Sequence, residues 1–148
     1  MADLSEPRVI AVGGPTASGK TALSVALAKT FDGEIINADS MQLYKGLDIG
    51  TAKPSPEEQQ GIPHHLLDFL PPETAYSVAD FTAAADPLIR EISGRGRLPF
   101  VVGGTGLYIT SLLNGMSFAP EKTDPAIRAR LQAQADAGDG AALYASCL

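Results

Sequence analysis

The stretch VGGPTASGKTAL, Val12 to Leu23, decides the fold because it holds the spacing G-x-x-x-x-G-K-T between an apolar run and a helix-like run. Gly14 and Gly19 let the backbone turn so that successive N–H groups point inward at an anion, and the helix N-terminus adds partial positive charge. Lys20 supplies a full charge to the outer phosphate, and the hydroxyl of Thr21 is placed to ligate Mg²⁺. The stretch therefore predicts a polyphosphate-binding loop.

The segments on either side of this loop alternate between strand and helix patterns. The apolar run at residues 8–12 predicts a strand buried on both faces, residues 20–31 predict an amphipathic helix, and residues 34–37 predict a second apolar strand. The helical stripe expected to face the core is Leu23, Leu27 and Phe31, with Ala26 and Thr30. Such alternation predicts a parallel α/β sheet.

Residues 41–72 lose this periodicity and are rich in Gly and Pro, which is typical of functional loops, with a short strand expected near residues 66–69. Ser77 and Asp80 then form a capping-box pattern that opens a helix, which we expect to kink or break at Pro87. The later elements expected are a buried strand at 98–102, a helix at 107–114, and a helix capped by Asp124 with Pro125 first and Gly138 as its stop.

Net charge, hydropathy and cysteine content argue against nucleic-acid binding by overall charge, against a membrane span and against an internal disulfide. The formal net charge of −6 argues against binding nucleic acid by the overall field, because phosphate backbones are bound by clustered Lys and Arg. No apolar stretch approaches the roughly 18 residues that cross a bilayer, and the N-terminal MADLSEPR carries acids, so a soluble cytoplasmic protein is expected. The single cysteine, Cys147, permits no internal disulfide and is expected to be buried or at a frayed end.

Two polar residues follow expected strands. Asp39 ends the strand IINADS, and ligands of open α/β sheets bind outside the carboxyl ends of strands, so Asp39 should face the same crevice as Lys20. It could be a metal-associated acid, a general base or a turn cap. Thr105, in VVGGTGLY, lies near a helix N-terminus and is expected to touch the ligand, unless the glycines around it serve packing alone.

Other polar residues carry weaker signals. His64 and His65 are adjacent, so in an extended chain they point to opposite faces and are not expected to share a metal. Arg128 and Arg130 lie on different faces of one expected helix. Four polar side chains of the long loop either line a substrate or are solvated: Tyr44, Lys45, Thr51 and Lys53.

The blocks GPTASGKT, NADSMQLYKGLDIGTAKP, PHHLLDF, YSVADF and VVGGTGLYI occur in the order and near the spacing of the tRNA dimethylallyltransferases, which the chain resembles from about residue 9 to residue 130. The resemblance implies transfer of the dimethylallyl group of dimethylallyl diphosphate to N6 of adenine 37 in tRNAs that read codons starting with U, assisted by Mg²⁺. The phosphate loop would then hold a diphosphate leaving group, although such segments are often labelled ATP-binding. The implied partners are the tRNA anticodon loop and dimethylallyl diphosphate, with no membrane, and a monomer is expected.

The resemblance also implies roles for individual residues. Asp39 resembles the general base that takes a proton from the adenine amine, with Lys20 and Thr105 as further catalytic residues, and Thr21 would hold Mg²⁺. The implied diphosphate-binding residues are Gly14, Pro15, Thr16, Ala17, Ser18, Gly19, Lys20 and Thr21. The implied tRNA-binding residues are Asp39, Ser40, Met41, Gln42, Thr105 and Arg128.

The implied fold is α/β: a P-loop NTPase-like parallel sheet flanked by helices in residues 1–118, with the start of a helical insertion in residues 119–148. We expect both to be parts of a longer protein. Other functions stay open for the same residues. They are a P-loop kinase of a small molecule or nucleotide, a transferase that prenylates free AMP or ADP as in cytokinin synthesis, and an idle phosphate-binding module.

Overall fold

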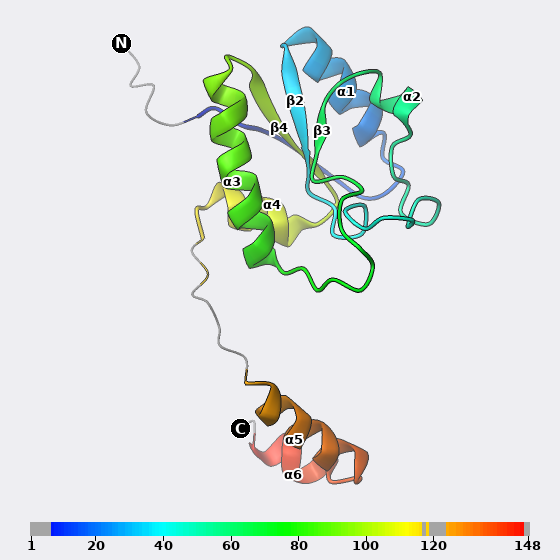
Figure 1. Ribbon diagram of the computed structural model, residues 1–148, viewed down its shortest axis with the longest axis vertical. Helices are drawn as coiled ribbons and strands as arrows, with labels where there is room; N and C mark the ends of the chain where they lie inside the picture. The colour runs from blue at the N-terminus through cyan, green and yellow to red at the C-terminus, as the bar shows by residue number, and fades with distance from the viewer. Residues whose placement is uncertain (1–6, 117, 119–123, 147–148) are drawn as a thin grey trace. The chain divides into compact units, whose positions relative to one another are not determined.

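The computed structural model describes residues 7–116, 118 and 124–146. The chain divides into two compact units, Met1–Ser117 and Phe118–Leu148 (Figure 1). The first unit holds a sheet with helices on its faces, and the second holds two helices. Within the described ranges, none of the helices combines the length and the apolar character that a membrane span requires.

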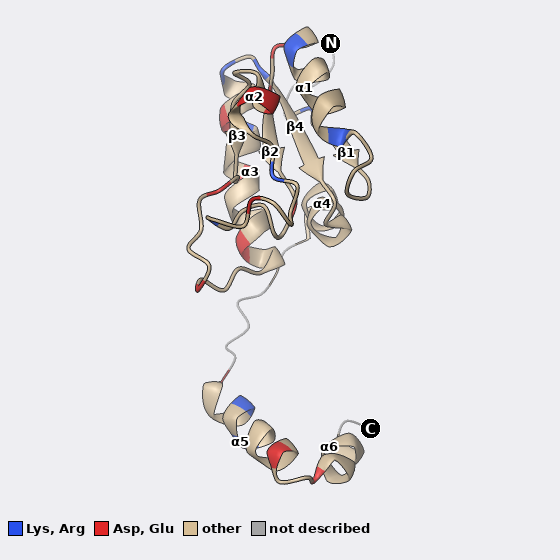
Figure 2. Cartoon of the chain, turned by 90° about the vertical axis from the view of Figure 1, so that its right-hand side faces the viewer, with Lys and Arg blue, Asp and Glu red and all other residues tan. Residues whose placement is uncertain are grey.

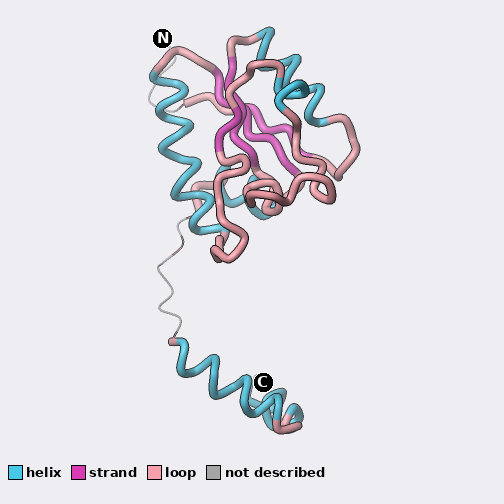
Figure 3. The backbone as a smooth tube through the Cα atoms, turned by 45° about the vertical axis from the view of Figure 1, so that its right-hand side comes forward, coloured by secondary structure: helices cyan, strands magenta, loops and turns pink. Residues whose placement is uncertain are grey.

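Four parallel strands form the sheet of the first unit, in the order β1-β4-β2-β3 (Figure 3). Their bounds are β1 (Ile10–Gly13), β2 (Gly33–Asn37), β3 (His64–His65) and β4 (Leu98–Gly103). Val102 of β4 pairs with Val12 of β1 and with Asn37 of β2, so these three strands end almost level. The predicted parallel α/β sheet is confirmed, and the loops that follow these strands open on one edge.

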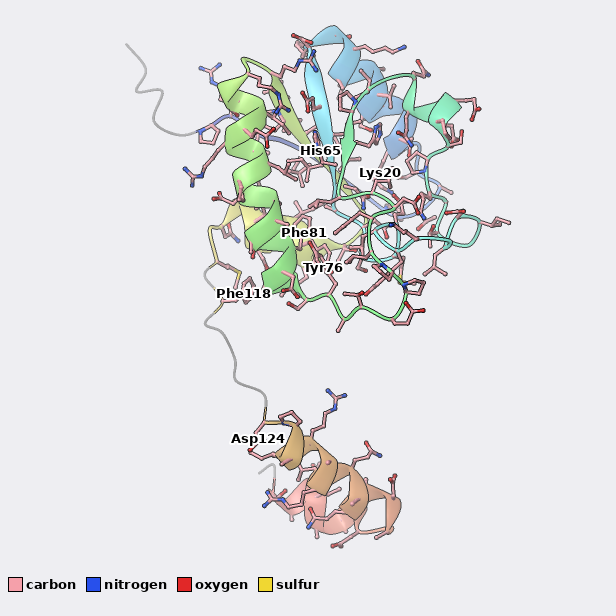
Figure 4. The ribbon with its side chains drawn as sticks, in the orientation of Figure 1. Lys20, His65, Tyr76, Phe81, Phe118 and Asp124 are labelled. Carbon is pink, nitrogen blue, oxygen red and sulfur yellow. The ribbon has the colours of Figure 1, made fainter. Side chains whose placement is uncertain are left out.

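Helices cover both faces of this sheet (Figure 1). Their bounds are α1 (Lys20–Thr30), α2 (Pro56–Gln59), α3 (Val78–Gly94) and α4 (Gly106–Leu113). Successive residues of a strand point to opposite faces, and β2 shows this clearly. Ile35 joins Val25 of α1 in one apolar cluster, whereas Ile36 joins Phe81 of α3 in the other. Phe81, labelled in Figure 4, projects from α3. It also stacks on Tyr108 of α4, with ring centroids 4.4 Å apart.

The face of α1 that packs on the sheet differs from the predicted stripe. Its buried residues are Ser24, Val25 and Ala28, whereas Leu23 is 54% exposed and Phe31 is 56% exposed. The small side chains of the buried face let the helix lie close to the sheet directly after the phosphate loop. The prediction followed the largest apolar residues and is wrong about most of the face, although Leu27 of the predicted stripe does pack against the core and the helix bounds agree.

The strand β1 lies at an edge of the described sheet. Its residues alternate between half-buried and exposed, and β4 pairs with it on one side. The prediction of a strand buried on both faces is therefore wrong for β1. It fits β2, whose five residues are all buried between its two neighbouring strands and the helices.

The segment between β2 and α3 is more ordered than the sequence predicts. The helix α2 begins with a capping box between Ser55 and Glu58, which the sequence analysis missed. The short strand is β3 and does not lie at residues 66–69. Leu66 and Asp68 have φ angles of 55° and 54°, and left-handed backbone at alternate positions cannot continue a strand.

The helix α3 confirms its predicted start, because Ser77 and Asp80 form the capping box. It then continues without a break through Pro87. Proline removes the hydrogen bond to the carbonyl of Ala83, and both residues lie on the exposed side of the helix, where water can satisfy that oxygen. The predicted break is therefore absent.

The second unit consists of α5 (Pro125–Asp136) and α6 (Gly140–Ser146). Asp124 caps α5 as predicted, with Pro125 in its first turn, and its side chain accepts a hydrogen bond from the N–H of Ala126 at 2.9 Å (Figure 4). Neither helix has a buried residue. Cys147 and residues 119–123, where we expected the insertion to begin, lie outside the described residues.

A buried carboxylate joins the amino-terminal ends of β2 and β4 to β3. The side chain of Glu34 is 4% exposed and accepts hydrogen bonds from His65 at 2.6 Å, from Arg95 at 2.8 Å and from Arg97 at 3.1 Å. Burial alone would raise the pKa of Glu34, but the hydrogen bonds from these three side chains outweigh it and lower the pKa below its usual 4.5. We call these four residues the Glu34 cluster.

Replacing Glu34 tests what this cluster contributes to stability. Glu34→Gln leaves two guanidinium groups without their buried anion, and we expect it to lower the free energy of unfolding by about 3 kcal/mol. Because the folded-state pKa is lowered, the wild-type contribution is present above about pH 4.5 and is lost as the pH falls through the folded pKa. In urea denaturation, the difference in the free energy of unfolding between wild type and Glu34→Gln should be smaller at pH 3 than at pH 7.

The matched control is Glu91→Gln. Glu91 pairs with the same Arg95 but its side chain is 60% exposed, so its loss should change the free energy of unfolding by about 0.5 kcal/mol or less. Equal effects of the two substitutions at pH 7 would contradict a special role for the Glu34 carboxylate.

Candidate functional site

The candidate site lies at the edge where β1, β2 and β4 end. The phosphate loop follows β1, Asp39 follows β2, and Thr105 follows β4. The ends of β2 and β4 meet at Gly103, where an added Cβ would lie 2.2 Å from the carbonyl oxygen of Ala38. The backbone N–H of Thr105 also donates to that carbonyl, at 3.2 Å. A glycine is therefore required to bring these two loops together.

The phosphate loop has the backbone that its glycines predict. Gly19 has a φ angle of 82° and precedes α1, whose first turn carries no acidic residue, so its N-terminal N–H groups remain favourable for an anion. Ala17 is also left-handed, with a φ angle of 62°. The ammonium group of Lys20 lies over the loop (Figure 4), donating to the carbonyl of Pro15 and, at 3.5 Å, to the hydroxyl of Ser18. The loop thus gathers N–H donors and one cation.

Two cavities open beside this loop. The first, of about 360 Å³, is lined by residues 16–22 of the loop and by Asp39, Gln42 and His64, among others. Its size is typical of a small-molecule site. The second, of about 580 Å³, is lined by Thr16, Asp39, Met41 and residues 46–51. Thr16 and Asp39 line both cavities, so one carboxylate lies between a phosphate-binding loop and a second space.

Asp39 combines two of the roles that the sequence allows. Its Oδ1 atom accepts hydrogen bonds from the backbone N–H of Met41 at 2.9 Å and of Gln42 at 3.4 Å, so it caps a turn. Within the described part of the chain, Oδ2 takes part in no hydrogen bond. The turn therefore fixes the carboxylate through one oxygen and leaves the other for a ligand, a metal or a proton.

Thr105 ties the two loops together. Its hydroxyl accepts a hydrogen bond from the backbone N–H of Ser40 at 2.9 Å and donates one to the Ser40 hydroxyl at 3.2 Å. Thr105 is not among the residues that line either cavity. The structure thus gives Thr105 a positioning contact next to Asp39, and its contact with a ligand stays a prediction.

The other residues expected to meet tRNA are distributed between the two units. Met41 is 50% exposed and lines the second cavity, and Gln42 lines the first. The amide of Gln42 is already engaged, donating to the carbonyls of Thr51 at 2.9 Å and Ala52 at 3.2 Å. Arg128 is exposed on α5 in the second unit. Their contacts with RNA stay predictions.

Thr21 and Asp39, the candidates from the sequence, both line the first cavity and offer oxygen atoms, as does Glu58 among other lining residues. Magnesium is usually bound by one or two protein groups together with substrate phosphates and water. Among the residues described, no group of three or more His, Cys, Asp and Glu could hold a metal by itself. An ion in this cavity would therefore depend on oxygen atoms of a bound substrate as well as on the protein.

His64 is a cavity residue that the sequence analysis did not predict. Its Nδ1 atom lies 2.8 Å from the carbonyl oxygen of Ile62, which can only accept, so the ring proton is on Nδ1. Burial lowers the pKa of His64, with a smaller effect of the neighbouring His65, and favours the neutral ring. No periodic pattern marks His64, and only the pairing of β3 with β2 brings it to the first cavity.

The four polar residues of the long loop separate into different environments. Thr51 lines the second cavity, whereas Tyr44, Lys45 and Lys53 line neither. Lys45 is exposed, and the hydroxyl of Tyr44 donates to the carbonyl of Thr74 at 3.0 Å. The side chain of Lys53 is 7% exposed, so it is neither solvated nor placed to touch a ligand in these cavities.

Comparison with known proteins supports one family. A family model described as IPP transferase matches residues 42–147. The chain is 54% identical over 138 residues to a tRNA dimethylallyltransferase of Anaeromyxobacter dehalogenans, covering 93% of this chain and 46% of the relative. It is 50% identical over 144 residues to one of Corynebacterium jeikeium, covering 97% and 46%. The chain thus spans less than half the length of these relatives.

Solved structures agree with this similarity. The full-length tRNA isopentenylpyrophosphate transferase of Bacillus halodurans matches with a TM-score of 0.76 and 49% identity, over 89% of this chain and 44% of that one. A eukaryotic dimethylallyltransferase solved acting on tRNA matches with a TM-score of 0.70 and 35% identity, over 85% and 35%. The fold of most of this chain therefore recurs in these solved structures.

The meeting of β2 and β4 can be tested at Gly103. Gly103→Ala forces a methyl group against the backbone at Ala38, so we expect a loss of about 3 kcal/mol in the free energy of unfolding, measured with urea. The control is Gly106→Ala, because a Cβ there meets no atom within 4 Å and alanine favours the first turn of α4. A Gly103→Ala protein as stable as the wild type would contradict the close approach.

Proposed function

Because this chain belongs to the IPP transferase family, we propose that it forms the diphosphate-binding and catalytic part of an enzyme that transfers a dimethylallyl group to tRNA. The acceptor would be N6 of adenine 37 in tRNAs that read codons starting with U, and the donor dimethylallyl diphosphate. The observation that carries this proposal is the position of Asp39, which lines both cavities at once. A carboxylate between two cavities is placed to act where a donor and an acceptor meet.

On the donor side, the diphosphate would lie against residues 14–21. The N–H groups of the loop and the ammonium of Lys20 stabilise the negative charge that grows on the leaving diphosphate. Each group placed at such developing charge typically lowers the free energy of the transition state by about 3 kcal/mol. Mg²⁺ would be held by the hydroxyl of Thr21 and by diphosphate oxygens, and it supplies further positive charge to the leaving group. The phosphates are therefore a leaving group, and carbon rather than phosphorus is attacked.

On the acceptor side, the second cavity would receive the adenine. The N6 nitrogen attacks C1 of the allyl group, the bond from C1 to the diphosphate oxygen breaks, and the N6 proton passes to the carboxylate of Asp39. An exocyclic amine is a weak nucleophile, so removal of its proton as the bond forms contributes about 10²- to 10⁴-fold. The adenine must leave its stack first, which costs less in a single-stranded anticodon loop than in a duplex.

The acidic charge of this chain limits its part in holding RNA. Its formal net charge is −6, and Figure 2 shows the basic segments scattered over several elements. The relatives are more than twice as long, which leaves room in their remaining part for a basic surface that binds the tRNA backbone. We assign residues 119–148 to the start of a helical insertion, in which Arg128 would contact tRNA. We also propose that the enzyme is a cytoplasmic monomer.

The direct test is an assay of the full-length protein with Mg²⁺, dimethylallyl diphosphate and unmodified tRNA. We expect prenylated adenosine, detected by nucleoside mass spectrometry, with release of diphosphate and no requirement for ATP. Transfer of the terminal phosphate of ATP without prenylation would instead indicate a kinase. Prenylation of free AMP without tRNA would indicate a nucleotide prenyltransferase, and binding of diphosphate without turnover would indicate an idle module.

The role of Asp39 predicts a separation of chemistry from binding. Asp39→Asn keeps an Oδ1 atom for the turn but cannot take up the N6 proton, so we expect kcat to fall by about 10²- to 10⁴-fold. The affinity for the diphosphate, measured by calorimetry, should stay within about twofold, since that affinity comes from the loop. Lys20→Met should lower both the diphosphate affinity and kcat, since Lys20 binds the diphosphate and stabilises the charge that grows on it. Unaltered turnover in Asp39→Asn would remove this residue from the mechanism.

A further inference from the structure

Lys53 is a buried cation at the centre of the segment between β2 and α2. Its ammonium group has three N–H donors and uses them on three partners. It donates to the carbonyl of Tyr44, to the carboxylate of Asp48 and to the carboxylate of Asp68, each at 2.7 Å. Burial alone would lower the pKa of Lys53, but the hydrogen bonds to Asp48 and Asp68 outweigh it, so the group stays charged. We call Lys53 and its three partners the Lys53 clasp.

The Lys53 clasp joins two segments of backbone that are separated in the sequence. Residues 44 and 48 precede Lys53 on the same loop, whereas Asp68 comes from the segment after β3. The clasp lies next to non-glycine residues in left-handed backbone, because Ala52 has a φ angle of 51° and Asp68 one of 54°. Such residues persist only where the surrounding structure holds them. Charge-assisted hydrogen bonds at both ends of the loop provide that restraint.

The loop that the clasp closes forms much of the second cavity. Residues 46–51 line this cavity together with Asp39 and Met41. The loop also holds apolar side chains in an exposed position, since Ile49 is 97% exposed and Leu47 is 38% exposed. The loop is fixed by a buried cation while Ile49 packs against little of the described protein, so Ile49 is free to meet an apolar surface of a ligand.

We infer that Lys53 is a positioning residue, which fixes residues 46–51 beside Asp39 so that the second cavity is formed before the acceptor base enters. This inference rests on the proposed function, because it takes the second cavity as the acceptor side. The ligand chemistry is the flat face of an unstacked nucleobase, for which Leu47 and Ile49 offer apolar contacts. Lys53 itself touches neither substrate and acts through the loop.

The test compares Lys53→Met with Lys45→Met in the full-length enzyme. Methionine keeps the length of the lysine stem and removes the three hydrogen bonds, while Lys45 is exposed on the same loop and outside both cavities. In Lys53→Met we expect KM for tRNA to rise by about 10- to 100-fold, because a displaced binding loop loses productive geometry. The KM for dimethylallyl diphosphate should change by less than about twofold, since the phosphate loop is untouched. Lys45→Met should alter neither value.

A second readout does not depend on catalysis. Hydrogen exchange of the amides of residues 46–51 should be faster in Lys53→Met and unchanged in Lys45→Met. Unchanged exchange and unchanged KM for tRNA in a folded Lys53→Met protein would overturn the inference. A wild-type enzyme that transfers no prenyl group would overturn the proposed function instead, and the exchange experiment would still decide whether the clasp holds the loop.

If Lys53→Met does not fold, Asp68→Asn takes its place. Asp68 is half exposed and lines neither cavity, and asparagine tolerates its left-handed backbone while removing one negative partner of Lys53. We again expect faster exchange and a higher KM for tRNA. The rise in KM should be about threefold, because only one of the three hydrogen bonds of Lys53 is weakened. Normal exchange together with a normal KM for tRNA in this variant would overturn the inference.

Discussion

The candidate site depends on a contact between two backbones. The ends of β2 and β4 lie so close at Gly103 that no side chain fits between them, and the carbonyl of Ala38 is shared with the N–H of Thr105. This contact places the turn that holds Asp39 beside the loop after β4. Because β1 ends at the same level, the phosphate loop is brought to the same edge. The chemistry proposed for this edge therefore follows from strand register and from a missing Cβ.

Much of the fold could be predicted because its signals are local. The strand-loop-helix order at the phosphate loop, the strands β2 and β4 and the capping box of α3 each follow from a few neighbouring residues, and the structure confirms them. The buried face of α1 could not be predicted from residue size, since Ser24 and Ala28 are buried while Leu23 is exposed. The position of β3 depends on pairing with a strand about thirty residues away and on left-handed residues that no sequence pattern marks.

The site itself could be predicted in part. The expectation that Asp39 shares a crevice with Lys20 follows from the rule for strand ends, and both residues line the first cavity. The sequence left open whether Asp39 caps a turn or serves chemistry, and the structure shows that one oxygen can do the first while the other stays available. The burial of Lys53 was beyond sequence reasoning, because its partners Asp48 and Asp68 lie in a segment without periodicity.

The Glu34 cluster lies at the opposite end of the strands from the phosphate loop, and this separation has an evolutionary consequence. None of the four residues that hold the sheet together there lines either cavity. Heat tolerance and turnover can then be adjusted at different places in the molecule, which weakens the usual trade between robustness and activity. Arg95 and Arg97 are thus positions at which the strength of the sheet can change at a distance from both cavities.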